Sequence, residues 1–550
     1  MDMEELKKIS TSGLSFMRLR AENRFYVDKS MLIADIIETD PSGVFLYTRP
    51  RRFGKSTNIS MIDAFFNLGY RGNDWFEGLE ISEHREFDIY RNAYPVICID
   101  LKDAVANGFD SFTGMLRNIM RNTFTVFRYL LESDSVYADE KEEIQSVLDR
   151  NITDLNMIFC IKDLCTMLER HHGRKAIVLI DEYDRAITDT IDSNDQKSMI
   201  DYLSSFMSAT LKSNPSLQMA YVTGVMQLAK TGMFSGVNNL RVNNILSRMS
   251  DERFGFTEEE VRSTLEYYGH PEKIDEVREW YDGYRFGNAE VYNPFSLMNY
   301  VSSGFVTEGY WASSGNDRPF RWMMERTGSG SVDALASIIS GAPAESDIHM
   351  DITYDDMRRS TDSDLHSLMV MTGYLKAVPS ADGRFAVSVP NKEVRNMLDR
   401  VIKSTVPVDD ALFRDFAVAV RDGDSAGMER MLGRLLDGSS YFDLKDESDY
   451  KLAVYLCLHG IIWNYDVESE EPEGNGRVDI IMKPKDPSLE PIIMELKMSG
   501  SESSLESDAE DGIRQIHERR YYNGMSGGVM LYGMAFRGVV PKVISEHIVL

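Results

Sequence analysis

Short apolar runs alternate with longer amphipathic stretches through the first half of the chain. Four of the runs, rich in β-branched and aromatic residues, have the length of buried strands. They are residues 43–48, 94–101, 175–184 and 218–224. Three segments between them have the length and spacing of helices, at residues 56–68, 111–131 and 196–212. Strands that alternate with helices in this way predict a parallel sheet covered on both faces.

The pattern changes near residue 251. Thr257, followed three residues later by Glu260, has the form of a capping box and predicts the start of a helix. From there to about residue 430 we expect mainly helices, with a flexible joint at residues 339–346. Near the C-terminal end we expect strands at residues 477–483, 491–497 and 528–534. An acidic, serine-rich loop at residues 499–512 is expected to precede a helix that carries Gln515.

The composition indicates a large folded protein. With 550 residues, 43% of them hydrophobic and 10% aromatic, the chain can form about three cores. Four cysteines in no zinc-binding spacing, and no apolar leader or run of about 20 apolar residues, favour a cytoplasmic protein with no membrane partner. The formal net charge of −28 repels nucleic acid at long range. Action on nucleic acid therefore requires a local basic surface or a metal ion.

The segment YTRPRRFGKST, residues 47–57, follows the first predicted strand and ends in a partial phosphate-binding loop. Between a strand and a helix, such a loop directs backbone N–H groups at phosphate. Lys55 would reach the terminal phosphates, and the Ser56 hydroxyl would bind Mg²⁺. The usual glycine five residues before Gly54 is Arg49 in this chain. Taken alone, the segment is equally consistent with a solvated basic loop.

A second motif makes the nucleotide interpretation stronger. The predicted strand at residues 175–184 carries Asp181 and Glu182 near its end, where one carboxylate can hold Mg²⁺ and the other can polarise a water molecule. The simpler interpretation is a polar strand end, but two such strands in this order predict a site for Mg-ATP. Thr223 ends the next strand, and is either a sensor of the γ-phosphate or an ordinary turn residue.

Seven segments together resemble the AAA-ATPase-like family of bacterial and archaeal proteins. They are FYVDKSMLI, RPRRFGKST, VLIDEYD, YVTGV, FSGVNNL, FGFTEEEV and WYDGY…YNPFSLMNY. The family writes its loop R-P-R-R-F-G-K-S, so the resemblance accounts for Arg49 and implies that the extra arginines add positive charge around the phosphates. The resemblance covers about residues 5–310 and implies a P-loop NTPase sheet with a helical lid.

The resemblance also implies functional residues. The residues expected to bind the nucleotide or its Mg²⁺ are Arg52, Phe53, Gly54, Lys55, Ser56, Thr57, Asp181 and Thr223, with Glu182 catalytic. Asp28 and Lys29 are expected near the nucleotide, although a capping aspartate and a surface lysine are equally consistent with the sequence. ATPases of this architecture often form oligomers and use an arginine from a neighbour. Arg241 and Arg248 are candidates for that arginine, and ordinary surface arginines are the alternative.

A second constellation lies near the C-terminal end. Alternate residues of a strand share a face, so Glu495 and Lys497 point the same way, and Asp479 on the preceding strand can lie beside Glu495. Two carboxylates can bind Mg²⁺, and the lysine can position or deprotonate a water molecule. The alternative is a surface hairpin with an ion pair. The tripeptide ELK alone carries no weight, because it also occurs at residues 5–7, in a helical-looking N-terminus.

Three segments of this region resemble the PD-(D/E)xK nuclease domain that is usually fused behind the AAA-ATPase-like domain. They are GNGRVDIIM, PIIMELK and RQIHERRYY, within about residues 445–540. The resemblance implies an α/β restriction-endonuclease-like fold with Asp479, Glu495, Lys497 and Gln515 as catalytic residues. Where the family commonly has a further glutamate, this chain has Pro472 between Glu471 and Glu473, so no third acidic ligand is assigned.

The sequence therefore predicts four parts. They are an ATPase domain at residues 1–250, a helical lid at 251–345, a helical connector at 346–440 and a nuclease-like domain at 441–550. We interpret the protein as an ATP-hydrolysing P-loop protein coupled to a Mg²⁺-dependent nuclease-like domain that acts on nucleic acid, with DNA favoured. The alternative is a nucleotide-regulated scaffold or binding protein whose C-terminal domain no longer cleaves.

Overall fold

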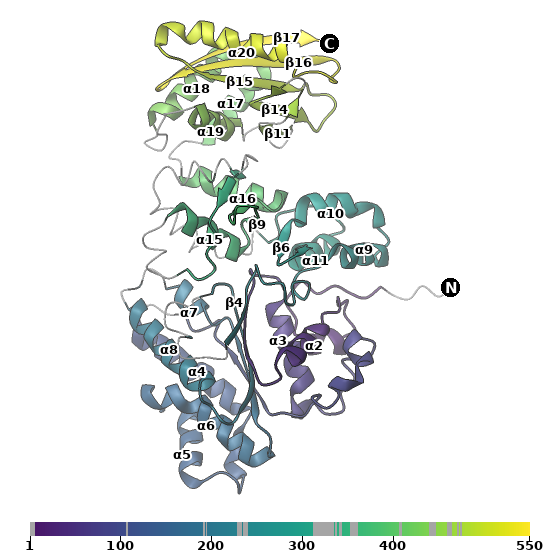
Figure 1. Cartoon of the computed structure of the whole chain (residues 1–550), viewed down its shortest axis with the longest axis vertical. Helices are drawn as coiled ribbons and strands as arrows, with labels where there is room; N and C mark the ends of the chain where they lie inside the picture. Colours follow the sequence, from purple (N-terminus) through teal and green to yellow (C-terminus); the bar gives the residue numbers. More distant parts are fainter. Residues whose placement is uncertain are drawn as a thin grey trace, which may run out of the picture. The chain divides into compact units, whose positions relative to one another are not determined.

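The apolar runs of the first half form a five-stranded parallel sheet in the computed structural model (Figure 1). The spatial order is β2-β3-β4-β1-β5, and every neighbouring pair is parallel. The strands are β1 (Val44–Thr48), β2 (Val96–Asp100), β3 (Ala176–Asp181), β4 (Leu217–Gly224) and β5 (Leu240–Asn243). The predicted parallel sheet is confirmed. Because β1 lies between β4 and β5, all five of its residues are buried, which its uninterrupted apolar sequence reflects.

The described residues form two units, and each is considered by itself. The structure describes residues 6–105, 108–190, 193, 195–227, 234, 240–311, 335, 338, 339, 344–352, 361–405, 410–438, 447–458, 465–469, 472, 473 and 476–550. The first unit comprises Met1–Met323, Ser346–Phe385 and Pro390–Val394, and the second comprises Met324–Glu345, Ala386–Val389 and Arg395–Leu550. Within the described part of the chain, no helix combines the length and the apolar character needed to cross a membrane.

Helices cover both faces of the parallel sheet, as predicted (Figure 1). On one face lie α1 (Phe16–Ala21), α2 (Met31–Thr39) and α3 (Lys55–Phe66). On the other lie α4 (Phe109–Thr125), α5 (Ala138–Leu148), α6 (Asp154–His172), α7 (Arg185–Thr188) and α8 (Gln196–Leu211). Short 3-10 helices lie at Leu68–Tyr70, Glu80–Glu83, Arg85–Phe87 and Arg128–Glu132. The predicted helical N-terminus is not found from residue 6 onward, because the chain runs without regular structure to α1.

Helices follow the sheet in the region that the sequence predicts as a helical lid, and we keep that name for the region. It contains α9 (Glu258–Tyr267), α10 (Ile274–Tyr281) and α11 (Pro294–Ser302), with a 3-10 helix at Pro271–Lys273 and a hairpin of β6 (Tyr284–Phe286) and β7 (Ala289–Val291). The predicted capping box is present, since Thr257 N donates to the Glu260 carboxylate at 2.8 Å and Glu260 N donates to Thr257 Oγ1 at 3.3 Å. Buried apolar residues of all three helices form one core, which includes Val261, Val277 and Leu297.

The predicted helical connector at residues 346–440 is not a single helical body. It contains β9 (Lys376–Pro379), β10 (Phe385–Ser388), α15 (Asp362–Thr372), α16 (Lys392–Thr405), α17 (Asp410–Asp422) and α18 (Ser425–Gly438). Its first part belongs to the first unit: a Cβ added at Gly373 would lie 2.9 Å from Pro50, and one at Gly283 would lie 2.0 Å from the Pro390 carbonyl oxygen. The predicted joint at 339–346 lies partly outside the described residues and ends in β8 (Ala344–Ser346).

The rest of the predicted connector belongs to the second unit, around a mixed sheet. Its spatial order is β11-β14-β15-β16-β17, with β15 and β16 parallel and the other pairs antiparallel. The strands are β11 (Tyr465–Ser469), β14 (Ile480–Pro484), β15 (Ile492–Met498), β16 (Gly528–Arg537) and β17 (Val540–Val549). A small hairpin of β12 (Pro472–Glu473) and β13 (Gly476–Arg477) precedes β14. Helix α20 (Leu505–Arg519) covers one face, and α17, α18 and α19 (Glu447–Leu458) cover the other (Figure 1).

Helix α20 begins inside the segment predicted as a loop. A 3-10 helix at Glu502–Ser504 leads into it, so only residues 499–501 keep the predicted irregular form. The buried residues Leu505, Ala509, Ile513 and Ile516 recur at helical spacing and form the stripe that faces the sheet. Four acidic residues and a glycine lie between these positions, so the buried stripe is difficult to recognise in the sequence.

Two glycines, Gly512 of α20 and Gly533 of β16, allow the helix to lie close to the sheet. This contact yields a stability prediction. A Cβ added at Gly533 of β16 would lie 2.0 Å from the Ala509 carbonyl oxygen. We expect Gly533→Ala to lower the free energy of unfolding of the second unit by about 3 kcal/mol, because backbone atoms must separate. Urea denaturation of the full chain measures the effect. Gly500→Ala is the matched control, since its Cβ would meet nothing within 4 Å; equal losses in the two variants would refute the prediction.

Candidate functional site

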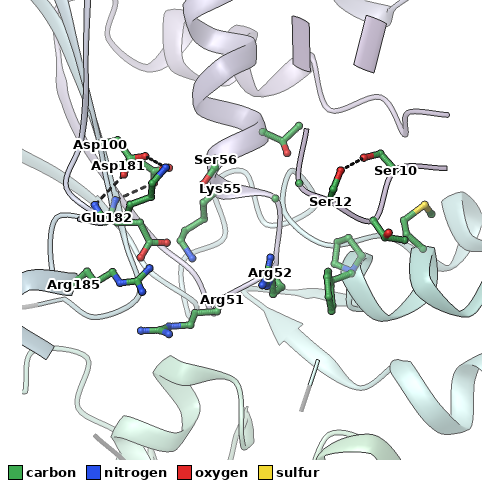
Figure 2. Close-up of a pocket in the computed structure, with 18 residues that line it drawn as sticks. Ser10, Ser12, Arg51, Arg52, Lys55, Ser56, Asp100, Asp181, Glu182 and Arg185 are labelled. Atoms are coloured by element: carbon green, nitrogen blue, oxygen red, sulfur yellow. Dashed lines mark hydrogen bonds and ion pairs between the residues drawn. The ribbon is translucent and has the colours of Figure 1, made fainter. Parts of the chain in front are cut away.

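A cavity of about 580 Å³ lies at the carboxyl-terminal edge of the parallel sheet (Figure 2). The loop between β1 and α3, the ends of β2 and β3, helix α11 and residues 10–13 contribute to its wall. The described residues that line it include five basic side chains, Arg51, Arg52, Lys55, Lys102 and Arg185, and three acidic ones, Asp100, Asp181 and Glu182. In a chain with a formal net charge of −28, this local excess of positive charge suits an anionic ligand.

The glycine–lysine–serine segment forms the start of α3. Gly54 takes a left-handed backbone with φ of 84°, and the first turn of α3 presents its N–H groups at the cavity. Lys55 bends back over the loop: its Nζ donates to the carbonyl oxygens of Arg49 at 3.0 Å and Pro50 at 2.9 Å. Burial lowers the pKa of the Lys55 ammonium group. The loop is therefore a preformed cradle whose lysine already lies inside it.

The two predicted Mg²⁺ ligands of this site, Ser56 and Asp181, both line the cavity. The Asp181 carboxylate accepts a hydrogen bond from the Thr223 hydroxyl. Burial raises the pKa of Asp181, and the nearby Ser56 and Thr223 hydroxyls oppose this shift. Asp100 is the partner of Asp181 in the β2–β3 register and also lines the cavity. Hydroxyl and carboxylate oxygens are the ligands that Mg²⁺ prefers. The donor set at this edge therefore fits a magnesium ion.

Glu182 lies beside this cluster in a strained conformation. Its φ of 54° is uncommon for a residue with a side chain, and its backbone N–H donates to Asp181 Oδ1 at 3.0 Å. The turn directs the Glu182 carboxylate into the cavity, on the side where Lys55 lies (Figure 2). The carboxylate is the principal negative charge that acts on the Lys55 ammonium group. Strain that is retained at a cavity wall indicates a functional position.

Arg49 does not line the cavity, contrary to the expectation that the extra arginines surround the phosphates. It is fully buried, and its guanidinium carbon lies 4.8 Å from the ring centre of Phe254 and 5.2 Å from that of Phe286. Its NH1 donates to the carbonyls of Thr48 and Asn243 at 2.8 and 3.0 Å, and its NH2 donates to Asn243 Oδ1 at 2.7 Å. Burial lowers the pKa of Arg49 to about 10. Arg49 thus joins β1 to β5 and the lid.

This arrangement predicts a large stability effect. We expect Arg49→Ala to lower the free energy of unfolding by about 3–5 kcal/mol, because it leaves a cavity and buried carbonyl groups without a donor. Arg49→Met fills more of the space, so it should cost less than alanine. Urea denaturation measures both variants, and Arg241→Ala at an exposed ion pair is the control. An Arg49→Ala loss no larger than that of the control would exclude a structural role.

The predicted residues of the second constellation are also brought together. Extension of the β14–β15 register, in which Ile480 pairs with Met494, places Asp479 opposite Glu495. Glu495 is 2% exposed, and its Oε1 accepts from Lys497 Nζ at 3.1 Å and from Gln515. Leu496 N donates to Asp479 Oδ2 at 2.8 Å. The alternative of a surface hairpin is therefore wrong, because the Glu495 carboxylate is buried between β15 and α20.

Glu495 has one carboxylate oxygen that fits a metal ion. Within the described part of the chain, its Oε2 is buried and has no hydrogen-bond partner. Burial, followed by the charge of Asp479, raises the pKa of Glu495 to about 7. An orphaned buried oxygen beside a second carboxylate is a suitable position for a divalent cation.

Sequence reasoning missed Lys451 on α19, whose Nζ lies 3.4 Å from Asp479 Oδ1. No local signal could have assigned it, since its position depends on how α19 packs on the mixed sheet. At the place of the missing family glutamate, Glu471 lies outside the described residues, and only the backbone of Pro472 and Glu473, which forms β12, is described. Among the described residues, no cluster of three metal-ligating His, Cys, Asp or Glu side chains occurs.

Two family models match the chain, one for each region that contains a site. Residues 12–234 match the family model described as Predicted AAA-ATPase, and residues 445–543 match that of the PD-(D/E)XK nuclease superfamily. The chain joins an AAA-ATPase-like domain to a PD-(D/E)XK nuclease superfamily domain. Both resemblances inferred from the sequence are thereby confirmed.

Individual relatives add names but no measured activity. An uncharacterized protein in the vnfD 5′ region of Azotobacter chroococcum mcd 1 is 25% identical over 405 residues, which are 72% of this chain and 70% of that protein. The solved structure of Drosophila ORC bound to AT-rich DNA and Cdc6 aligns at 10% identity and a TM-score of 0.19, over 71% of this chain and 91% of that one. The Aeropyrum pernix ORC2 protein in ADPNP-ADP complexes aligns at 10% identity and a TM-score of 0.25, over 68% and 93%.

Some residues that were expected to contact the nucleotide do not line the cavity of the AAA-ATPase-like domain with their side chains. The Phe53 ring is buried, 4.9 Å from the ring centre of Tyr284, so its side chain points away from the cavity. Thr223 is fully buried behind Asp181 and does not line the cavity. Arg52 and Thr57, which were also predicted, do line it. Its hydroxyl contacts the Asp181 carboxylate, so it positions this carboxylate.

Asp28 and Lys29 also lie away from the cavity of the AAA-ATPase-like domain. Asp28 accepts from the backbone N–H groups of Ser30 and Glu80 at 2.8 and 2.7 Å. Lys29 Nζ lies 2.6 Å from the Glu260 carboxylate at the start of α9. The expectation that they lie near the nucleotide is thus wrong, and Lys29 instead attaches the N-terminal region to the lid.

The two candidate arginine fingers differ in position. Arg241 is the second residue of β5, and it pairs at 3.1 Å with Asp40, which precedes β1. It therefore lies at the amino-terminal edge of the parallel sheet, opposite the cavity. Arg248 is exposed in the segment after β5, and neither arginine lines the cavity.

Proposed function

We propose that the AAA-ATPase-like domain binds and hydrolyses Mg-ATP. The observation that carries this proposal is the convergence of Lys55, Ser56, Asp181 and Glu182 on one basic cavity at the carboxyl edge of the sheet. The cavity volume of about 580 Å³ lies in the range of ligand pockets, roughly 300–1,000 Å³.

The residues at the phosphate end have distinct roles in this proposal. The N–H groups at the start of α3 bind phosphate oxygens, and Lys55 moves from the loop carbonyls to the terminal phosphates. Ser56 and Asp181 hold Mg²⁺, which neutralises phosphate charge when bound. Glu182 orients the attacking water and accepts its proton. Thr223 keeps the Asp181 carboxylate in place.

The other end of the cavity suits the nucleoside. Phe295 and Met298 of α11 line it together with Ser10–Gly13. The Arg52 guanidinium lies 4.7 Å from the Phe295 ring centre, so this arginine bridges the loop and the lid across the cavity. An aromatic and a thioether side chain provide apolar contact for a base. We therefore propose that a bound nucleotide extends from the phosphate-binding loop to α11.

Displacement of a fluorescent ATP analogue tests nucleotide binding. Lys55→Ala is expected to bind ATP at least about 100-fold more weakly than wild type, since a charge-assisted contact of about 3 kcal/mol is lost. Lys212→Ala, at an exposed lysine of the same domain, is the control and should bind normally. Unchanged affinity in Lys55→Ala, or no ATP binding by wild type, would refute the proposal.

We further propose that the PD-(D/E)XK domain cleaves nucleic acid, with DNA favoured, and that ATP turnover controls this activity. The orphaned Oε2 of Glu495 beside Asp479 supports a Mg²⁺ ion at this position. When bound, Mg²⁺ acts as a Lewis acid on a phosphodiester and offsets the repulsion expected from the acidic chain. Lys497 positions the attacking water, and Gln515 holds the Glu495 carboxylate in place.

The raised pKa of Glu495 predicts a pH dependence. Mg²⁺ needs the ionised carboxylate, so affinity at this site should fall up to about tenfold per pH unit below about 7. Without metal, the native state holds a proton that the unfolded state releases between pH 4.5 and about 7. Metal-free stability should therefore decline as pH rises through this window, and Mg²⁺ should restore it. Calorimetric Mg²⁺ titrations without ATP, at pH 6, 7 and 8, measure the affinity, and a pH-independent affinity would contradict the prediction.

A further inference from the structure

One buried carboxylate holds two arginines at the wall of the nucleotide cavity. Arg185 is the first residue of α7, and its Nε donates to Asp189 Oδ2 at 3.2 Å. Arg51, from the loop after β1, has its NH2 3.8 Å from Asp189 Oδ1. The Asp189 side chain is only 11% exposed. Two guanidinium groups from separate segments therefore meet at a single anchor.

Both arginines belong to the same cavity as Lys55 and Glu182 (Figure 2). Their side chains are 24% and 36% exposed, so they are held by the protein and still accessible to a ligand. The Arg185 bond to Asp189 uses Nε, and the two terminal nitrogens are not part of it. The Arg51 backbone is fixed as well, since its carbonyl accepts from Trp311 Nε1 at 3.0 Å. Such groups match the geometry of phosphate oxygens.

The other cations of the cavity wall have different contacts. Lys102 is paired with Asp100 at 2.8 Å, at the end of β2. Arg52 lies over the Phe295 ring toward the lid. Arg51 and Arg185 are thus the arginines that lie on the side of Glu182, where the water would be oriented (Figure 2).

We propose that Arg51 and Arg185 bind the terminal phosphate of ATP from within the same chain, so that hydrolysis needs no arginine from a second copy. The proposal rests on the proposed Mg-ATP function and assigns the arginine that the sequence left open. In the reaction, water adds to the terminal phosphorus and the bond to the bridging oxygen breaks. ADP leaves with that electron pair, and the water proton passes to Glu182. The two arginines stabilise the charge on the transferring phosphoryl group.

Three measurements on Arg51→Ala and Arg185→Ala test this assignment, with Arg241→Ala as the matched control. Turnover should fall at least about 100-fold in each variant, since an arginine supplied within one chain contributes about 10³-fold or more. The preference for ATP over ADP should fall about tenfold, because only ATP carries the terminal phosphate. Wild-type turnover per chain should not depend on protein concentration.

Mixing two inactive variants distinguishes an arginine supplied by the same chain from one supplied by a neighbouring chain. If a neighbour supplied the arginine, Lys55→Ala chains would restore activity to Arg185→Ala chains, because each would provide what the other lacks. We expect no restoration. Arg185→Lys keeps the charge in the same space, so it should fold like wild type, which melting temperatures check, and still lose most of the turnover. Restored activity, or an ATP-to-ADP preference equal to that of Arg241→Ala, would overturn the proposal.

The outcome is separable from failure of the proposed function. If wild type binds ATP but does not turn it over, hydrolysis is refuted, and the ATP-to-ADP preference alone decides the role of the two arginines. If wild type binds no nucleotide, both the proposed function and this assignment are wrong.

Discussion

Replacement of Glu182 by glutamine is expected to lower ATP turnover at least about 100-fold while ATP affinity changes less than about threefold. The amide has nearly the same shape as the carboxylate but cannot accept the proton of the attacking water. Glu182 lies beside the proposed Mg²⁺ ligands Ser56 and Asp181 but is not itself one of them, so Mg-ATP binding should persist. Steady-state phosphate release and displacement of a fluorescent ATP analogue measure the two quantities separately.

The control for this variant is Glu142→Gln, at an exposed glutamate of α5. It removes one negative charge from the same unit and should leave turnover unchanged. At residue 182, glutamine has the same backbone strain at φ of 54° as glutamate, so a loss of turnover reflects the missing carboxylate and not a change in strain. If Glu182→Gln retains turnover, or loses ATP affinity in proportion to turnover, Glu182 does not act on the water.

Replacement of Lys497 by alanine is expected to abolish Mg²⁺-dependent cleavage of nucleic acid, a decrease of about 10³-fold or to background. Lys497 Nζ lies 3.1 Å from Glu495 Oε1, so its removal leaves the buried carboxylate without its cation and the attacking water without its partner. Glu495→Gln should have a similar effect, because the amide is a poorer magnesium ligand. Cleavage of linear, circular and single-stranded DNA and of RNA, with ATP and Mg²⁺ varied, provides the measurement.

The matched control is Lys542→Ala, which removes an ion-paired lysine from β17 of the same sheet. Its ammonium group lies 3.2 Å from Glu429 of α18, so the variant should cleave like wild type. If wild type cuts no substrate at any Mg²⁺ or ATP concentration, cleavage is excluded and the scaffold alternative holds. If Lys497→Ala cuts as fast as wild type, the site lies elsewhere.

Features that depend on neighbouring residues could be predicted from the sequence. The phosphate-binding loop needs a strand, a glycine, a lysine and a helix start in succession, and all are contiguous from Val44 to Phe66. The capping box at Thr257 is local for the same reason. Glu495 and Lys497 share a face because strand residues alternate. Asp100 could also have been predicted as a residue of the site, since it lies near the end of a predicted strand, as Asp181 does.

Features that depend on distant contacts could not be predicted. The role of Arg49 depends on Phe254 and Phe286, more than 200 residues later in the chain. Lys451 acquires its partner, Asp479, only when α19 packs on the mixed sheet. The start of α20 was missed because acidic residues between its buried positions resemble a loop. In each case tertiary packing, and not local preference, determines the outcome.

Counting bound Mn²⁺, used in place of Mg²⁺, by electron paramagnetic resonance tests the two-site arrangement most directly. We predict two ions per chain in the presence of ATP. One requires ATP and is lost in Ser56→Ala, and the other binds without ATP and is lost in Asp479→Asn. A chain that binds no ATP-dependent ion, or whose ions are unaffected by both substitutions, would contradict the proposed pair of magnesium sites.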